Sequence, residues 1–305
     1  MSLKSIAFRI YHKKDVLILF ELNDGRLIVY SSDKIIYIYK RTMNIDFRIN
    51  KINSVIQSMI QTQDQNLICC SYEITILKLF KSSYEIVQII KTWTNKIIEI
   101  KELEGNINYN NSLLASQNNY IRIYQTSEKQ KLYKLNYEYN FGENINNIIY
   151  LKNNDYAILL DDYFKNIYLK IFDLKTKTIK ESLYQIKAKE SGEMLIIDNK
   201  YLIVSLYLNL ILVDIEGPYK ILHIFKTSFG CVHSFCKLNN NIFLSGDDVG
   251  DIIEWKIEKN KIKKIKEYNS SKKDIYSVIK YNNNENSRIV TGSNNGIILF
   301  YEIDY

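Results

Sequence analysis

The chain alternates short apolar runs with polar turns from one end to the other. The runs are rich in Ile, Val, Leu and Tyr, and Asn, Asp and Gly separate them. Runs of this length and composition, bounded by turn-forming residues, predict β-strands. No window sustains a helical period over the roughly 12 residues that a helix would need. The pattern therefore predicts an all-β protein.

The apolar runs also recur with a period. When the segments that resemble the strand around Trp255 are aligned, each has one apolar anchor residue at the position of Trp255, and successive anchors lie 41 to 48 residues apart. Repeats of about 40 to 45 residues, each holding several short strands, are typical of β-propeller blades. Seven blades are predicted, with anchors at Tyr39, Phe80, Tyr124, Phe172, Val213, Trp255 and Tyr301.

The two chain ends complement each other in this scheme. Two apolar strands precede each anchor strand, and a more polar fourth strand follows six of the seven. The seventh lacks it, whereas an apolar segment at residues 3–10 precedes the first complete blade. Pairing this segment with the last blade would cover an open sheet edge. We therefore predict one domain over residues 1–305, with blades at about 15–50, 54–90, 96–140, 144–186, 193–226, 231–268, and 274–305 plus 3–10.

Residues 242–257, IFLSGDDVGDIIEWKI, resemble the second half of a WD40 repeat through Ser245, Gly246, Asp247 and Trp255. The resemblance to the WD40-repeat family extends over the whole chain. It implies a seven-bladed β-propeller of four-stranded antiparallel blades that serves as a scaffold within a protein complex. Family members can join a His, a Ser or Thr, an Asp and a Trp by hydrogen bonds across one blade. Here Ser228 replaces the His, so only part of that network is expected, and other propeller families stay open.

Net charge and cysteine content indicate which partners and which cellular compartment to expect. The chain has 41 basic and 34 acidic residues, a net charge of +7, which permits an acidic partner without requiring one. Four cysteines, two of them adjacent, do not form a disulfide framework, so we expect an intracellular location, cytoplasmic or nuclear. No apolar run approaches the roughly 18 residues of a membrane span, and Lys4 and Arg9 interrupt the apolar N-terminus, unlike a signal peptide.

One segment, CVHSFC, invites a zinc hypothesis through Cys231, His233 and Cys236. Structural zinc needs four converging ligands. Strand alternation instead puts residue 236 on the face opposite to residues 231 and 233. Buried thiols are the expected outcome, and no metal site is predicted.

The acidic turn with Asp247, Asp248 and Asp251 lacks the residue order of a calcium loop. We expect Asp247 or Asp248 to accept hydrogen bonds from backbone amides of its own turn. The sequence contains no nucleophile elbow, glycine-rich phosphate loop or metalloprotease motif. It therefore predicts no catalytic residue and no cofactor.

Aromatic residues gather on one predicted loop face, where the turn between the second and third strands of each blade and the connection to the next blade lie. Clustered aromatic side chains are common anchors for protein partners. The alternative is that each ring packs against its own blade. The candidates for binding peptides or other subunits are Trp93 and Phe164 first, then Tyr163, Phe141, Tyr72, Tyr120, Phe229 and Tyr268.

The opposite loop face is rich in lysine. It could bind an anionic partner, a phosphoinositide or RNA, which is the alternative function. The competing interpretation is that these lysines keep the protein soluble, since Glu residues dilute their charge. Direct nucleic-acid binding is not expected, because no base-reading motif occurs. The candidate anion-binding residues are Lys259, Lys261, Lys263, Lys264, Lys40 and Arg41.

Overall fold

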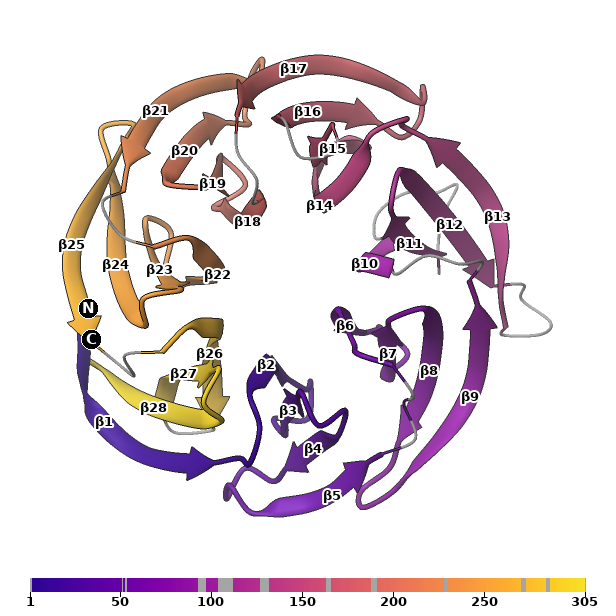
Figure 1. Ribbon diagram of the computed structural model, residues 1–305, viewed down its shortest axis with the longest axis vertical. Helices are drawn as coiled ribbons and strands as arrows, with labels where there is room; N and C mark the ends of the chain where they lie inside the picture. Colours follow the sequence, from indigo (N-terminus) through magenta and orange to yellow (C-terminus); the bar gives the residue numbers. More distant parts are fainter. Residues whose placement is uncertain are drawn as a thin grey trace. The chain divides into compact units, whose positions relative to one another are not determined.

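The computed structural model describes residues 2–50, 52, 54–92, 97–103, 112–126, 132–162, 166–187, 191–227, 230–269, 273–283 and 286–304. Within these ranges every regular element is a β-strand, and the strands β1 to β28 form seven four-stranded sheets (Figure 1). All paired strands run antiparallel. The prediction of an all-β protein with four-stranded blades is confirmed.

Each sheet corresponds to one predicted blade, and we number the sheets accordingly. The blades fall into two compact units, which we call unit 1 (Met1–Lys51 with Glu190–Tyr305) and unit 2 (Ile52–Lys189). Unit 1 contains blades 1, 5, 6 and 7, and unit 2 contains blades 2, 3 and 4. The prediction of a single domain stays a prediction.

The strands of unit 1 are as follows. Blade 1 contains β2 (Val16–Glu21), β3 (Leu27–Ser31), β4 (Ile36–Tyr39) and β5 (Ile45–Ile49). Blade 5 contains β18 (Ser191–Ile197), β19 (Tyr201–Leu206), β20 (Asn209–Asp214) and β21 (Lys220–Lys226). Blade 6 contains β22 (Val232–Lys237), β23 (Ile242–Asp247), β24 (Asp251–Glu258) and β25 (Lys261–Asn269). Blade 7 contains β26 (Ile275–Asn283), β27 (Asn286–Ser293), β28 (Ile297–Asp304) and β1 (Ser2–Tyr11).

The strands of unit 2 follow the same order. Blade 2 contains β6 (Ser58–Gln61), β7 (Asn66–Cys70), β8 (Glu73–Leu79) and β9 (Tyr84–Lys91). Blade 3 contains β10 (Ile97–Leu103), β11 (Ser112–Gln117), β12 (Tyr120–Thr126) and β13 (Tyr133–Asn140). Blade 4 contains β14 (Asn144–Lys152), β15 (Asp155–Asp161), β16 (Ile167–Asp173) and β17 (Thr178–Ile186).

Blade 7 is built from both ends of the chain. β1 pairs with β28 along its length, with Tyr11 opposite Ile297 (Figure 1). Just beyond this pair, the His12 amide donates to the Gly296 carbonyl at 2.7 Å. Gly296 has φ +76°, and a Cβ there would lie 2.3 Å from the His12 carbonyl oxygen, so the close approach requires glycine. The predicted completion of the last blade by residues 3–10 is confirmed.

Neighbouring blades within a unit bury apolar faces against each other. Trp255, the best match to the repeat, is fully buried between blades 5 and 6 and contacts Phe225 and Phe243. Its Nε1 donates to Ser245 Oγ at 2.8 Å, which satisfies the indole N–H inside the core. The expected partial network is therefore present, and Ser228 lies outside the described residues.

Six of the seven predicted anchors are buried, but the anchor predicted at Phe80 is wrong. It follows the end of β8 and is 42% exposed. In blades 1, 3, 4, 5 and 6 the anchor directly follows a register shift between the third and fourth strands. In blade 2 the residue in that position is Leu77, which is fully buried. The apolar pattern alone does not show where a bulge moves the chain by one residue.

The acidic turn of blade 6 forms as expected. Asp247 Oδ1 accepts hydrogen bonds from the amides of Val249 and Asp251 at 3.1 and 2.9 Å. The carboxylate is buried, and its Oδ2 has no hydrogen-bond partner within the described part of the chain. Burial raises the pKa of Asp247 to about 6, against the bonds from the two amides. At pH values between the ordinary pKa of aspartate and this raised pKa, the folded state keeps the Asp247 proton and the unfolded chain releases it.

This difference predicts a pH dependence of stability. Between about pH 4 and pH 6 the unfolded chain loses the Asp247 proton while the folded chain keeps it, so wild-type stability falls as pH rises through this window and then levels off. Asp247→Asn keeps the Oδ1 acceptor and removes the titration. Urea unfolding across this range should show wild type losing up to about 2 kcal/mol relative to the variant. Parallel pH profiles for the two proteins would contradict this account.

Candidate functional site

Three of the candidate aromatic residues are described in unit 2: Tyr72, Tyr120 and Phe141. They lie at one end of blades 2, 3 and 4, with the turns between second and third strands and the connections to following blades. We call this end the unit 2 loop face. Trp93, Tyr163 and Phe164 belong to the same predicted set but lie outside the described residues.

Tyr72 is the described candidate with the most exposed ring. It lies in the turn between β7 and β8, and 55% of its surface is accessible to solvent. Its backbone is held in place, because the Thr92 hydroxyl donates a hydrogen bond to the Tyr72 carbonyl oxygen. The adjacent Ser71 amide donates to the Glu73 carbonyl at 3.0 Å, which fixes the turn itself. An exposed ring on a fixed backbone can contact a partner at a small cost in conformational entropy.

The bond to Tyr72 is the end of a chain of polar contacts between blades 2 and 3. Gln117 Nε2 donates to Thr92 Oγ1 at 3.3 Å, and Gln117 Oε1 accepts a bond from Arg122 Nη1. Arg122 Nε in turn donates to Glu138 Oε2 at 2.5 Å. Gln117 and Arg122 are 1% and 9% exposed. These hydrogen bonds connect the buried Arg122 guanidinium to the exposed turn at Tyr72 and hold that turn in one position.

In the third strand of blades 3 and 4, an aromatic residue is followed two positions later by a cationic residue. In β12 the Arg122 guanidinium lies 5.2 Å from the centre of the Tyr120 ring. In β16 the Lys170 ammonium lies 4.8 Å from the Tyr168 ring centre and 2.6 Å from Glu143 Oε2. Each cation is therefore held by one ring and one carboxylate. Both partly buried rings are positioned by this contact.

Two aspartates at the unit 2 loop face accept hydrogen bonds from nearby side chains. Asp161 accepts bonds from the Asn144 and Asn146 amides at 3.3 and 2.8 Å. Asp162 accepts from Asn166 and, at 3.2 Å, from the Tyr168 hydroxyl. Desolvation and the Asp162 carboxylate raise the pKa of Tyr168.

Two other candidates are packed against their own blades. Phe141 is partly buried and packs against the core between blades 3 and 4, with its ring centre 4.7 Å from that of Tyr139 and 4.9 Å from that of Phe172. In unit 1, the Tyr268 hydroxyl donates to the buried Glu254 carboxylate at 2.7 Å. For these two residues the structure favours a packing role, and Phe229 lies outside the described residues.

The candidate basic residues of unit 1 are largely engaged within the chain. Lys263 pairs with Glu258, and Lys264 pairs with Glu267. In blade 1 the Lys40 ammonium lies 3.5 Å from the Asp46 carboxylate. Lys259 and Lys261 are exposed at the same hairpin. Binding of a phosphoinositide or RNA here stays a prediction.

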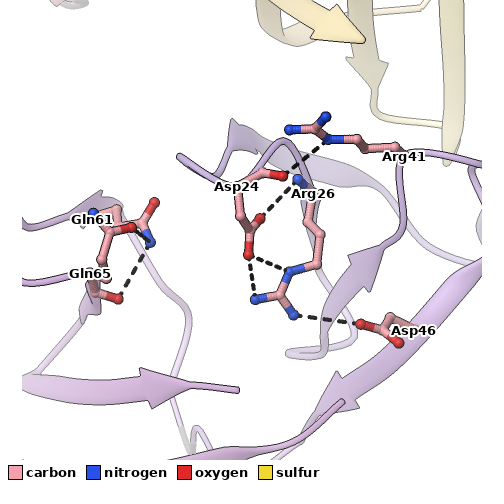
Figure 2. Close-up of polar contacts among 6 residues, drawn as sticks. All are labelled: Asp24, Arg26, Arg41, Asp46, Gln61 and Gln65. Atoms are coloured by element: carbon pink, nitrogen blue, oxygen red, sulfur yellow. Dashed lines mark hydrogen bonds and ion pairs between the residues drawn. The ribbon is translucent and has the colours of Figure 1, made fainter. Parts of the chain in front are cut away.

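Arg41 belongs to a polar cluster at the turns of blade 1. Its Nε donates to the Asp24 carbonyl at 3.0 Å, while Arg26 bridges the Asp24 and Asp46 carboxylates at 2.8 and 3.5 Å (Figure 2). A Cβ on Gly25 would collide with the Arg41 guanidinium. Arg41 therefore holds two turns together, which limits its availability to an external anion.

The CVHSFC segment does not gather metal ligands. Cys236 is buried, and burial raises the pKa of its thiol to about 12, while the His233 ring packs 5.6 Å from that of Tyr276. No cluster of three or more His, Cys, Asp or Glu side chains suited to a metal ion occurs among the described residues. The acidic turn with Asp247 is occupied by its own backbone amides instead.

No protein-family model matches the chain, and no curated protein matches it in sequence. Among solved structures, it is similar to the Cps50 (Swd1) β-propeller domain of Myceliophteria thermophila, with a TM-score of 0.76. The alignment has 10% sequence identity and covers 98% of this chain and 99% of that domain. This chain has the fold of a seven-bladed β-propeller. The fold expected from the repeats and from the WD40 resemblance is thus confirmed, and the propeller contains no helix able to cross a membrane among its described residues.

The sequence analysis did not predict the series of hydrogen bonds that supports the Tyr72 turn. Its members, Thr92, Gln117, Arg122 and Glu138, are separated by up to 46 residues, and no motif joins them. One signal was visible: Arg122 interrupts the otherwise apolar third strand of blade 3. A charge in a strand buried on both faces requires a partner.

Removing the guanidinium tests this arrangement. Arg122→Met keeps the apolar stem but removes the guanidinium that donates to the buried Gln117 oxygen and to Glu138, so we expect the free energy of unfolding to fall by about 1–3 kcal/mol. Denaturant unfolding measures the change. Lys134→Met, at an exposed position of neighbouring β13, is the control and should change stability by less than about 0.5 kcal/mol. Equal effects of the two substitutions would contradict the assignment.

Proposed function

We propose that this propeller is a non-catalytic scaffold subunit that binds another protein through the unit 2 loop face. The main observation behind the proposal is that Tyr72 is 55% exposed while its backbone is held in place. A series of hydrogen bonds through Thr92 and Gln117 connects it to Arg122. Tyrosine and arginine are the residue types that most often dominate binding energy at interfaces. A strand framework can hold such loops without being altered by them.

The contacts at this face indicate the kind of partner. Arg122 and Lys170 each lie beside an aromatic ring and pair with a carboxylate, Glu138 and Glu143 respectively. These contacts set the orientation of the Tyr120 and Tyr168 rings. A face with one exposed ring and two oriented, partly buried rings favours a protein segment that presents an apolar side chain.

Substitution of Tyr72 distinguishes a binding role from a packing role, because the two roles predict different effects on stability and on partner capture. Tyr72→Ala removes an exposed ring and keeps the carbonyl that accepts from Thr92, so stability should change by less than about 0.5 kcal/mol. Partner capture should fall at least about tenfold, as expected for loss of an interface anchor. Affinity purification of tagged protein from its native cells, followed by identification and quantification of co-purifying chains, measures the capture.

Tyr150→Ala is the matched control. Tyr150 is the same residue type in the same unit, is 41% exposed, and lies near the opposite end of blade 4. It should retain every co-purifying chain that Tyr72→Ala loses. If both variants capture the same chains as wild type, the unit 2 loop face is not the binding surface.

A further inference from the structure

The outer edge of blade 2 has an apolar centre and charged ends. Among the described strands β9 pairs only with β8, so its second edge is open at the outer end of the blade (Figure 1). Its side chains alternate between partly buried and exposed along all eight residues. The exposed series is Glu85, Val87, Ile89 and Lys91, in which Val87 and Ile89 are 41% and 47% accessible. An exposed strand edge with an apolar centre is a template for pairing with another strand.

Two other outer strands carry charge next to their exposed apolar residue. β25 exposes Lys263 and Lys266 on either side of Ile265, and β17 exposes Lys180 beside Ile179. Such lysines oppose the approach of a second strand, because pairing would remove their charge from water. β9 has charges only at the ends of its exposed series. β21 also has its charges at its ends, but two antiparallel copies centred on His223 would place Lys220 opposite Lys226. Among the described outer strands, β9 is therefore better suited to pairing with its own copy.

The other side of β9 is fixed. Gln88 Nε2 donates to the Tyr133 carbonyl and Gln88 Oε1 accepts from the Tyr133 amide, each at 2.8 Å. The side-chain amide thus bonds the backbone of β13 in blade 3 as a strand would. Ile90 packs against the core between these blades. The exposed edge is consequently held in an extended, pre-organised conformation.

The exposed series is complementary to itself when reversed. If two β9 strands pair antiparallel with Gln88 opposite Gln88, then Glu85 faces Lys91 of the second copy and Val87 faces Ile89. Two ion pairs thereby flank four aliphatic side chains. Glu85 and Lys91 have no ion-pair partner within the described ranges, so both are available. This self-complementarity is what a two-fold symmetric contact requires.

We propose that two copies of this chain associate through antiparallel pairing of β9 with β9. The register favours a second copy over an unrelated partner, because both the charged ends and the apolar centre match this chain's own strand. A register shift opposite Ile76 and Leu77 makes Val87 an extra residue in β9, which shortens the regular part of the edge. The contact is therefore small, and association depends on protein concentration.

Sedimentation velocity over a series of concentrations of the full chain tests the pairing. Wild type should shift from monomer to dimer, and Ile89→Lys should weaken the association at least about tenfold, since it brings two ammonium groups into the centre of the contact. Ile179→Lys, with a similar exposed fraction on β17, is the control and should leave association unchanged. Thermal unfolding verifies that each variant is folded.

A charge exchange distinguishes this register from any other. Glu85→Lys alone and Lys91→Glu alone place like charges opposite each other in a homodimer, so each should dimerise less than wild type. When the two variants are mixed in equal amounts, one copy carries lysine at both positions and the other carries glutamate at both. Each facing pair then has opposite charges again, so the mixture should recover the wild-type dimer fraction. A monomer at every concentration, a dimer indifferent to Ile89→Lys, or a mixture that fails to recover overturns the proposal.

Discussion

The antiparallel pairing of β1 with β28 is the interaction on which unit 1 depends most. It supplies the fourth strand of blade 7 from the opposite end of the chain, and blade 7 in turn packs apolar side chains against blade 6 and blade 1. The exit from β1 is also fixed, because the His12 imidazole lies 2.8 Å from the Tyr39 hydroxyl of blade 1 and its carbonyl lies against Gly296. Burial lowers the pKa of His12, so this contact is made by the neutral ring at neutral pH. Without β1, the edge of β28 and the faces beside it would meet water.

The strands could be predicted from the sequence because two periods coincide. Alternation of side chains locates each strand, and recurrence every 41 to 48 residues groups them into blades. The same reasoning paired residues 3–10 with the last blade, since only one strand was missing and only one was spare. It failed at Phe80, where a large aromatic residue just beyond β8 was chosen over Leu77. Alignment with the strand around Trp255 suggested the anchor, whereas the bulge that decides which side chain enters the core has no signature in the pattern.

The candidate site was less predictable, because its properties come from contacts between residues far apart in sequence. Tyr72, Phe141 and Tyr268 all lie near loops, yet Tyr72 is exposed, Phe141 packs against a core and Tyr268 donates to a buried glutamate. Contacts made in the folded structure separate them, not the local sequence. The rigid setting of Tyr72 similarly depends on Gln117 and Arg122, which reach it through Thr92. Composition placed the aromatic residues on loops, and only packing determined which of them face solvent.

Hydrogen exchange of the full chain, followed residue by residue, tests the central role of β1 most directly. If the ends of the chain close blade 7 as described, amides of β1 and β28 that bond each other should open only in global unfolding, with the same free energy as amides of β23 and β24 in blade 6. If β1 amides instead exchange at the rate of an unstructured peptide while blade 6 stays protected, blade 7 does not need β1, and the account is contradicted.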